Sequence, residues 1–130
     1  MLMNARTGDA VAETVELADT RETRRRGLLG RKSFDASSAI ILLPCFSVHT
    51  AFMKFAIDVV FIDRDGVVVH SVRNMTPWRT AGAWRAHAVV EFAAGAIAAR
   101  DIRVGDRLFL AAQRAPEEAT VSWHTGAVKV

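Results

Sequence analysis

The chain has 130 residues, with 17 Lys and Arg against 14 Asp and Glu, which gives a net charge of +3 and a pI near 9.7. Hydrophobic residues make up 51% of the sequence and charged residues 24%, a composition that indicates one globular domain and excludes a disordered or fibrous chain. The positive excess is too small to indicate a nucleic-acid-binding protein, so no nucleic acid partner is expected. The single cysteine excludes an intramolecular disulfide and a cysteine-only zinc site.

Nothing in the sequence indicates a membrane span or an export signal. The longest apolar run covers residues 39–44 and is far too short to cross a bilayer. The first residues lack the apolar core of a signal peptide. We therefore expect a cytoplasmic protein without a transmembrane segment.

The N-terminal part predicts a strand followed by a short helix. Branched and polar residues alternate along residues 11–18, as in a half-buried strand. Asp19 or Thr20 offers an N-cap for a helix over residues 21–29, and Gly30 offers its C-terminal stop. The arginines of this helix are expected to form a solvated face.

A β-hairpin over residues 57–72 is the clearest local signal. Residues 57–62 and 67–72 are rich in branched side chains, and Gly66 can adopt the positive φ that the turn between them requires. Both strands are apolar on both faces, so we expect a central hairpin that is covered on both sides. Asp58 interrupts the apolar run and is expected to be paired for structural reasons, with Lys54 nearby in the sequence, because burying an unpaired charge is costly.

The remaining segments complete a fold in which strands dominate. Further strands are expected at residues 39–43, 48–55, 87–93 and 107–112, and a helical turn at residues 94–100. Residues 73–86 have no period and are expected to form a long loop, while residues 113–130 are expected to be a C-terminal appendix, with an edge strand at 121–123 as an option. The predicted fold is a mainly β (α+β) single domain over residues 1–112. It would be either a small β-barrel or a strongly curved antiparallel or mixed sheet with two short helices.

Six segments, in their order and spacing, are similar to the markers of a bacterial and archaeal family known as domain of unknown function 192. They are RGLLGR at 26–31, FMK at 52–54, IDVVFID at 57–63, DG at 65–66, EFAAG at 91–95 and VGD at 104–106. The match covers residues 13–110, although residues 52–56 read FMKFA where the family more typically has WMKNT. The resemblance implies a compact β-rich domain and no established activity. It leaves an envelope association open, because many relatives look exported or membrane-tethered.

The aromatic and arginine side chains in residues 73–86 are expected to be exposed on the loop, and they predict that this loop forms the rim of a ligand-binding pocket. Trp and Arg are the residue types of binding hot spots, and loops on a rigid scaffold are where binding groups collect. Together with the turn at residues 44–49, this loop is expected to surround the main pocket, unless the indoles instead cap the open end of a barrel. Glu91 is expected to form an ion pair with Arg31 or Lys54. The predicted ligand-binding residues are Trp78, Arg79, Trp84, Arg85, Cys45, His49, Lys54 and Glu91.

The function expected from these features is a binding module for a small polar or anionic ligand or a protein partner, with no cofactor, no metal and no catalytic residue. The alternative is a small hydrolase or metal-dependent enzyme in which Cys45, His49 and Asp58 act together. An alternative metal site would use Cys45, His49, Met53 and His70, whose soft ligand atoms suit copper or zinc. An enzyme requires these polar groups to converge on one point.

Overall fold

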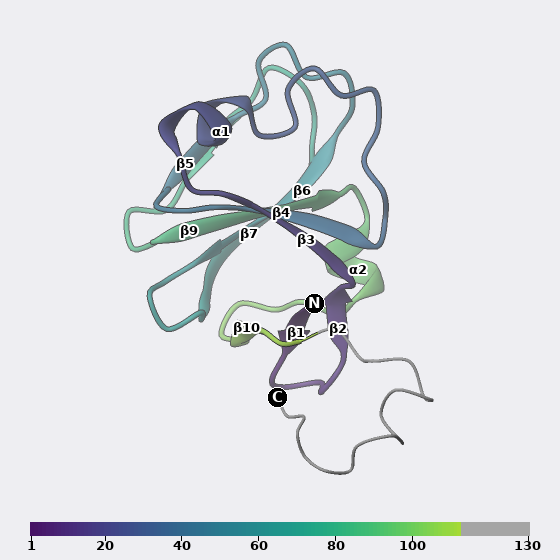
Figure 1. The fold of residues 1–130 in the computed structure, drawn as a ribbon, viewed down its shortest axis with the longest axis vertical. Coiled ribbons are helices and arrows are strands. Elements are labelled where there is room, and N and C mark those ends of the chain that lie inside the picture. Colours follow the sequence, from purple (N-terminus) through teal and green to yellow (C-terminus); the bar gives the residue numbers. More distant parts are fainter. Residues whose placement is uncertain (113–130) are drawn as a thin grey trace.

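A computed structural model of the protein describes residues 1–112. Within them the chain forms short strands and two short helices (Figure 1). In chain order these are β1 (Leu2–Asn4), β2 (Ala10–Ala12), β3 (Thr14–Ala18), α1 (Arg21–Arg26), β4 (Ser38–Leu42), β5 (Ser47–His49), β6 (Ile57–Ile62), β7 (Val68–Met75), β8 (Thr80–Gly82), β9 (Ala88–Ala93), α2 (Ala96–Ala99) and β10 (Leu108–Leu110). Neither helix has the length or apolar character that crossing a lipid bilayer would require.

A five-stranded mixed sheet in the order β3-β4-β9-β6-β7 forms the centre of the molecule. β3 and β4 are parallel and are connected through α1, while the other neighbouring pairs are antiparallel. Two smaller antiparallel sheets, β10-β1-β2 and β5-β8, complete the described part of the chain. The sheets are separate and do not close into a barrel, so the mixed-sheet form of the predicted mainly β fold is confirmed and its barrel form is wrong.

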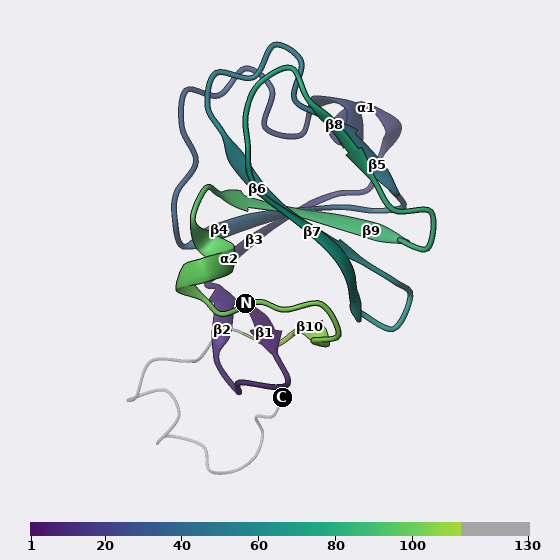
Figure 2. The same cartoon turned by 180° about the vertical axis from the view of Figure 1, so that it is seen from behind.

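The two faces of the central sheet are covered by different elements. In Figures 1 and 2, α1 and the β5-β8 pair lie on one side of the sheet, and α2 with the three-stranded sheet lies on the other. Strand alternation sends neighbouring side chains to opposite faces, so the molecule has two apolar cores. One contains Val60, Val90 and Ile97, and the other contains Leu28, Val59 and Val89.

The predicted hairpin is present as β6 and β7, and Gly66 has the expected positive φ of 84°. β6 lies between β9 and β7, and all its residues from Ile57 to Phe61 are buried. β7 is the edge strand of the sheet, and His70 on it is exposed. The expectation of a hairpin covered on both sides is therefore correct for β6 and wrong for β7.

Local backbone geometry changes three other predicted elements. The strand at residues 11–18 is split at Glu13, because the amides of Glu13 and Thr14 both donate to the carbonyl of Ser37. The strand at 48–55 ends at His49, since Phe52 has a φ of 65° and cannot continue it. The loop at 73–86 instead holds the end of β7 and all of β8, which pairs with β5. The predicted appendix, with its optional edge strand, lies outside the described residues.

Candidate functional site

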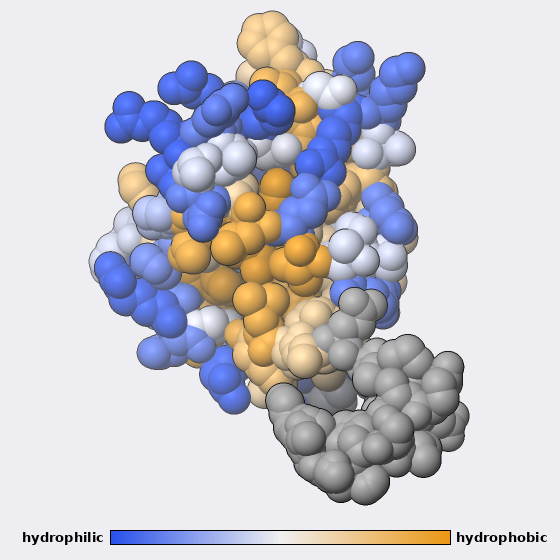
Figure 3. Space-filling view, in the orientation of Figure 1, coloured by the Kyte–Doolittle hydropathy of each residue, from blue (hydrophilic) through white to orange (hydrophobic). Residues whose placement is uncertain are grey.

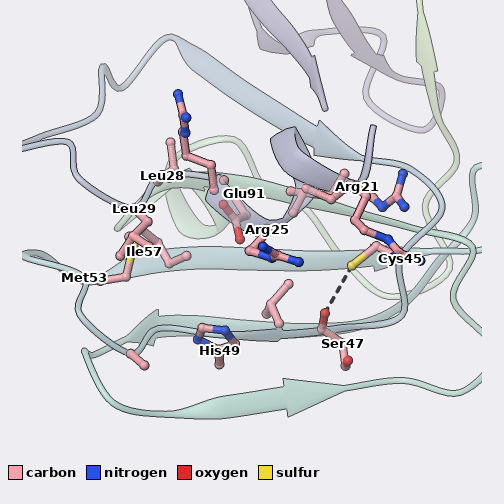
Figure 4. A pocket seen from close by; sticks show the side chains of 16 residues that line it. Arg21, Arg25, Leu28, Leu29, Cys45, Ser47, His49, Met53, Ile57 and Glu91 are labelled. Carbon is pink, nitrogen blue, oxygen red and sulfur yellow. Dashed lines mark hydrogen bonds between the residues drawn. The ribbon is translucent and has the colours of Figure 1, made fainter. Parts of the chain in front are cut away.

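A cavity of about 290 Å³ lies between α1, its following loop and β5, on the α1 face of the central sheet. This volume is near the lower end of the range for small-molecule sites. Figure 4 shows side chains from α1, from β5 and from the sheet directed into the same space. Its lining residues are Arg21, Arg24, Arg25, Arg26, Gly27, Leu28, Leu29, Leu42, Cys45, Ser47, Val48, His49, Ala51, Met53, Ile57 and Glu91.

α1 and the loop after it form one wall of the cavity, and the shape of this wall depends on where the helix begins and ends. Thr20 caps the helix, exchanging hydrogen bonds with Thr23 in a capping box. The helix then ends at Gly27, whose φ of 46° and ψ of −123° suit glycine far better than other residues. The helix is therefore shorter than predicted, and the reversal at Gly27 directs the buried side chain of Leu28 toward the sheet.

Arginines form the mouth of the cavity. Arg21, Arg24 and Arg25 are spaced i, i+3 and i+4, which places them on one side of α1. Arg24 donates from Nη1 to the carbonyls of Asp19 at 2.9 Å and Leu43 at 3.3 Å, which fixes α1 against the segment after β4. Figure 4 shows Arg25 directed into the space between α1 and β5. Figure 3 shows hydrophilic side chains gathered over the α1 end of the molecule.

Glu91, on β9, is the buried polar group of this cavity. Its neighbours Val90 and Phe92 face the α2 side of the sheet, so Glu91 faces α1. The residue is only 5% exposed, and its Oε1 atom has no hydrogen-bond partner among residues 1–112. Burial raises the pKa of the Glu91 carboxyl to about 7, and the charge of Arg31 only partly opposes this rise.

The ion pair predicted for Glu91 does not form. Arg31 instead makes two hydrogen bonds to Glu16, with Nη1–Oε2 and Nη2–Oε1 distances of 2.9 and 2.7 Å. This pairing lowers the pKa of the Glu16 carboxyl. Lys54 is exposed and forms no salt bridge within residues 1–112. The prediction of an Arg31 or Lys54 pair is wrong because Arg31 binds Glu16 on β3, which is separated from β9 by β4.

Gly27 permits the close approach of the α1 loop to Glu91. A Cβ atom at position 27 would lie 3.3 Å from Oε1 of Glu91, tighter than an ordinary van der Waals contact. The main chain of the loop therefore covers one side of the carboxyl group and excludes water there. This cover is one reason why Glu91 is desolvated.

Cys45, His49 and Met53 line the same cavity. The Cys45 thiol is half-buried and donates to the carbonyl of Ser47 at 3.1 Å. Burial is the main reason why the pKa of this thiol is raised. His70 lies apart on β7, in a different depression. Within residues 1–112, no three His, Cys, Asp or Glu side chains gather closely enough to hold a metal ion.

Asp58 faces away from this cavity. Its neighbour Ile57 lines the cavity, so the alternation of β6 directs Asp58 to the opposite face. There it accepts hydrogen bonds from the amides of Asn74 at 2.8 Å and Ile97 at 2.9 Å. The structural interpretation of Asp58 is thus supported, although its partners are backbone amides and not Lys54. The alternative set of Cys45, His49 and Asp58 is not brought together.

The aromatic and arginine residues predicted at the rim lie outside this cavity. Trp78 is 62% exposed and packs edge-on against Phe52, with ring centroids 4.6 Å apart. Trp84, which is 88% exposed, and Arg85 lie beside the β6–β7 turn. Arg79 lines the depression next to His70. The indoles plug no barrel, and the predicted loop and turn do not enclose one common pocket.

The feature that sequence reasoning missed is the role of α1. Its arginines are expected to form a solvated face, and Arg21, Arg25 and Arg26 are exposed. Four arginines of the helix also contribute to the cavity lining, together with Leu28 and Leu29. Their i, i+3, i+4 spacing was the available signal, because it concentrates positive charge on one side of a short helix. The opposite wall of the cavity includes residues of β5 and β9, and only the three-dimensional structure shows that these residues face α1.

Comparisons with known proteins agree with this fold. The model of the domain of unknown function 192 family, described as "Uncharacterized ACR", matches residues 3–110. A UPF0127 protein from Pyrococcus furiosus is 35% identical over 113 residues, which cover 82% of this chain and 95% of that protein.

Two solved structures share the fold. A protein of unknown function from Novosphingobium aromaticivorans has a TM-score of 0.68 and 24% identity, with 74% of each chain covered. A protein from Sinorhizobium meliloti also has a TM-score of 0.68, with 22% identity, 73% of this chain covered and 79% of the other. At these identities the likeness shows the fold alone.

Proposed function

This chain belongs to the domain of unknown function 192 family, and from that premise we propose that it is a small-molecule-binding module whose site is the cavity between α1 and β5. The ligand would lie under the α1 loop, in contact with Cys45, His49 and Glu91 of the predicted binding residues. The other predicted residues, such as Trp84, would be surface groups outside this site.

The observation that supports this proposal is the unpaired carboxyl group of Glu91. Buried polar atoms are nearly always hydrogen-bonded, because an unsatisfied one costs about 1–3 kcal/mol. The Oε1 atom of Glu91 has no partner among residues 1–112, and Glu91 is one of the residues that line the cavity. A bound molecule that supplies the missing hydrogen bond would remove this cost.

The charge and shape of the cavity favour a ligand over a second protein chain. The space is concave and combines apolar walls such as Leu28 and Ile57 with a few polar groups, which is the usual composition of a small-molecule site. The arginines at its mouth favour an acidic group on the ligand. A ligand with both an acidic end and a hydrogen-bonding end would use all of these features.

The alternative enzyme function lacks the required geometry. A cysteine nucleophile needs a lowered thiol pKa and a base within hydrogen-bond reach. The Cys45 thiol donates to the Ser47 carbonyl, and burial raises its pKa. Asp58, the predicted third member, is held on the opposite face of the sheet. Binding is therefore the function that the geometry supports best.

A fragment screen by protein-observed NMR tests this proposal. We expect small acidic or amphoteric fragments to shift the amide resonances of residues 21–29 and 45–49. Glu91→Gln should weaken the binding of the amphoteric fragments, because an amide replaces the carboxylate that would accept their hydrogen bond at the inner end of the cavity. Trp84→Ala, which removes an exposed side chain outside the cavity, is the matched control and should leave their affinity unchanged.

A different result would support the loop site predicted from the sequence. In that case the fragments would shift only the resonances of residues 76–87, and Trp84→Ala would weaken their binding while Glu91→Gln would not. A screen in which no fragment shifts residues 21–29 or 45–49 would contradict the proposal.

A further inference from the structure

We infer that the cavity binds a small molecule with an amino group at one end and an acidic group at the other, separated by a short apolar segment. This inference rests on the proposed function and specifies its ligand class. The amino group would lie on Glu91, and the acidic group would lie between Arg21 and Arg25 at the mouth.

The inner end of the cavity, at Glu91, favours a positively charged hydrogen-bond donor on the ligand. Glu91 is buried, and its Oε1 atom accepts no hydrogen bond within residues 1–112. The nearby cation, Arg31, already makes two hydrogen bonds to Glu16. A neutral hydroxyl group would satisfy one lone pair, but an ammonium group would also compensate the buried negative charge, which is the larger part of the cost.

The outer end of the cavity calls for an acid. Arg26 pairs with Glu22 across one helical turn, whereas Arg21 and Arg25 form no salt bridge within residues 1–112. Both side chains are exposed, and both line the cavity. Guanidinium groups bind carboxylate or phosphate oxygens through paired hydrogen bonds. A ligand that carried only a positive charge would be repelled here.

The middle of the cavity is apolar. Leu28 and Ile57 are buried, and Leu29 and Met53 are half-buried at its edge. Apolar walls between a buried carboxylate and a cationic mouth would contact a chain of methylene groups. The length of that chain sets how well the two ends of the ligand reach their partners.

Isothermal titration calorimetry with ω-amino acids tests the inference on the full chain. The probes are β-alanine, 4-aminobutanoate, 6-aminohexanoate and 8-aminooctanoate, with hexanoate and hexylamine as single-charge controls. We expect one chain length to bind best, and to bind about tenfold or more tightly than either control, because a charge-assisted hydrogen bond is lost at one end.

Variants assign each end of the ligand. Glu91→Gln should reduce the affinity for the best amino acid to about that for hexanoate and leave hexanoate unchanged. Arg25→Ala should reduce it toward the affinity for hexylamine. Trp84→Ala should have no effect on any probe.

The direction of proton exchange gives an independent readout. Because burial raises the pKa of the Glu91 carboxyl to about 7, an ammonium ligand that binds the charged form of Glu91 should release protons near pH 7. Calorimetry in buffers of different ionisation enthalpy measures this release. Glu91→Gln should abolish this release. Arg24, Arg31 and the Cys45 thiol also face this region, and His49 lines the cavity. Trp84→Ala, which changes a side chain outside the cavity, is the control and should retain the release.

Hexanoate that binds as tightly as every amino acid and takes up protons would overturn the inference and leave the proposed function intact. The absence of binding by all six probes would also overturn it, and the fragment screen would then decide the proposed function separately.

Discussion

Two buried carboxylates on neighbouring strands, Asp58 and Glu91, differ in almost every respect except burial. In the β6–β9 register Asp58 lies opposite Phe92, and Glu91 lies opposite Val59, so the two side chains are one position apart and face opposite sides of the sheet. Asp58 accepts hydrogen bonds from two amides. Glu91 has a buried oxygen that accepts none within residues 1–112.

The elements that cover each face explain this difference. The N-cap residue of α2 is Gly95, which has no side chain to cap the helix, and Asp58 supplies the missing acceptor by accepting a hydrogen bond from the amide of Ile97. On the other face, the α1 loop passes over Glu91 with a glycine and offers it no donor. The α2 face is completed by the chain itself, and the α1 face holds a cavity where a ligand can complete it.

Removing the satisfied carboxylate should have the largest effect on stability. Asp58→Ala would leave the amides of Asn74 and Ile97 without their acceptor, and we expect a loss of about 4 kcal/mol in the free energy of unfolding. Urea denaturation monitored by circular dichroism measures it. Asp58→Asn should lose less, since its amide oxygen can still accept one of the two bonds. A loss below about 1 kcal/mol for Asp58→Ala would show that these bonds do not hold α2 in place.

Removing Glu91, the unsatisfied carboxylate, should instead increase the free energy of unfolding. The pKa of Glu91 is raised from 4.5 to about 7, so the folded state binds the proton more tightly than the unfolded state does. Stability should therefore fall as pH rises from about 4.5 to about 7, and above that range the charged form costs up to about 3 kcal/mol. Glu91→Gln cannot ionise, so it should be more stable than the wild type at pH 8.

Thermal or urea unfolding of both proteins between pH 4 and 9 checks this prediction. The difference between them should be near zero at pH 4.5 and largest above pH 7. Asp106, whose pKa is lowered to about 2 mainly by its hydrogen bond to Arg6, should change stability only in more acidic solution and does not confuse the comparison. A constant difference across the range would show that Glu91 is not buried in its charged form.

The sequence predicts only part of the difference between Asp58 and Glu91. An Asp inside the apolar run 57–62 indicates a paired structural group, and the run itself predicts the strand correctly. Its actual partners are backbone amides more than fifteen residues away along the chain, and no local pattern reveals them. The same limit applies to Glu91, because the competition between Glu16 and Glu91 for Arg31 is decided by the parallel pairing of β3 with β4.

The short helix shows a second limit. Its start was predictable from Thr20, because N-cap chemistry is local. Its end was placed at Gly30, although Gly27 ends it with a positive φ. Two glycines three residues apart both qualify as a stop, and only packing of Leu28 into the core selects the first. That choice determines which residues cover Glu91.

Adding a methyl group at Gly27, which lies against Glu91, should have a moderate effect on stability. Gly27→Ala would place a methyl group 3.3 Å from Oε1 of Glu91 in a backbone conformation that favours glycine. We expect a loss of about 2 kcal/mol in unfolding free energy and weaker binding of any fragment in the cavity. Gly30→Ala is the matched control, since its φ is also positive but a Cβ there meets no atom within 4 Å. Equal fragment affinities in the two variants would show that the loop does not border the site.

The exposed indoles should contribute least, which makes them the sharpest check on where the site lies. Trp84 is 88% exposed, so Trp84→Ala should change the free energy of unfolding by less than about 0.5 kcal/mol. Trp78→Ala should cost somewhat more, on the order of 1 kcal/mol, because it also loses the edge-on contact with Phe52. Neither change should alter fragment affinity at the cavity, measured by NMR titration in parallel with Glu91→Gln. If either indole variant weakened those fragments as much as Glu91→Gln does, the unpaired carboxylate would not be what distinguishes the α1 face.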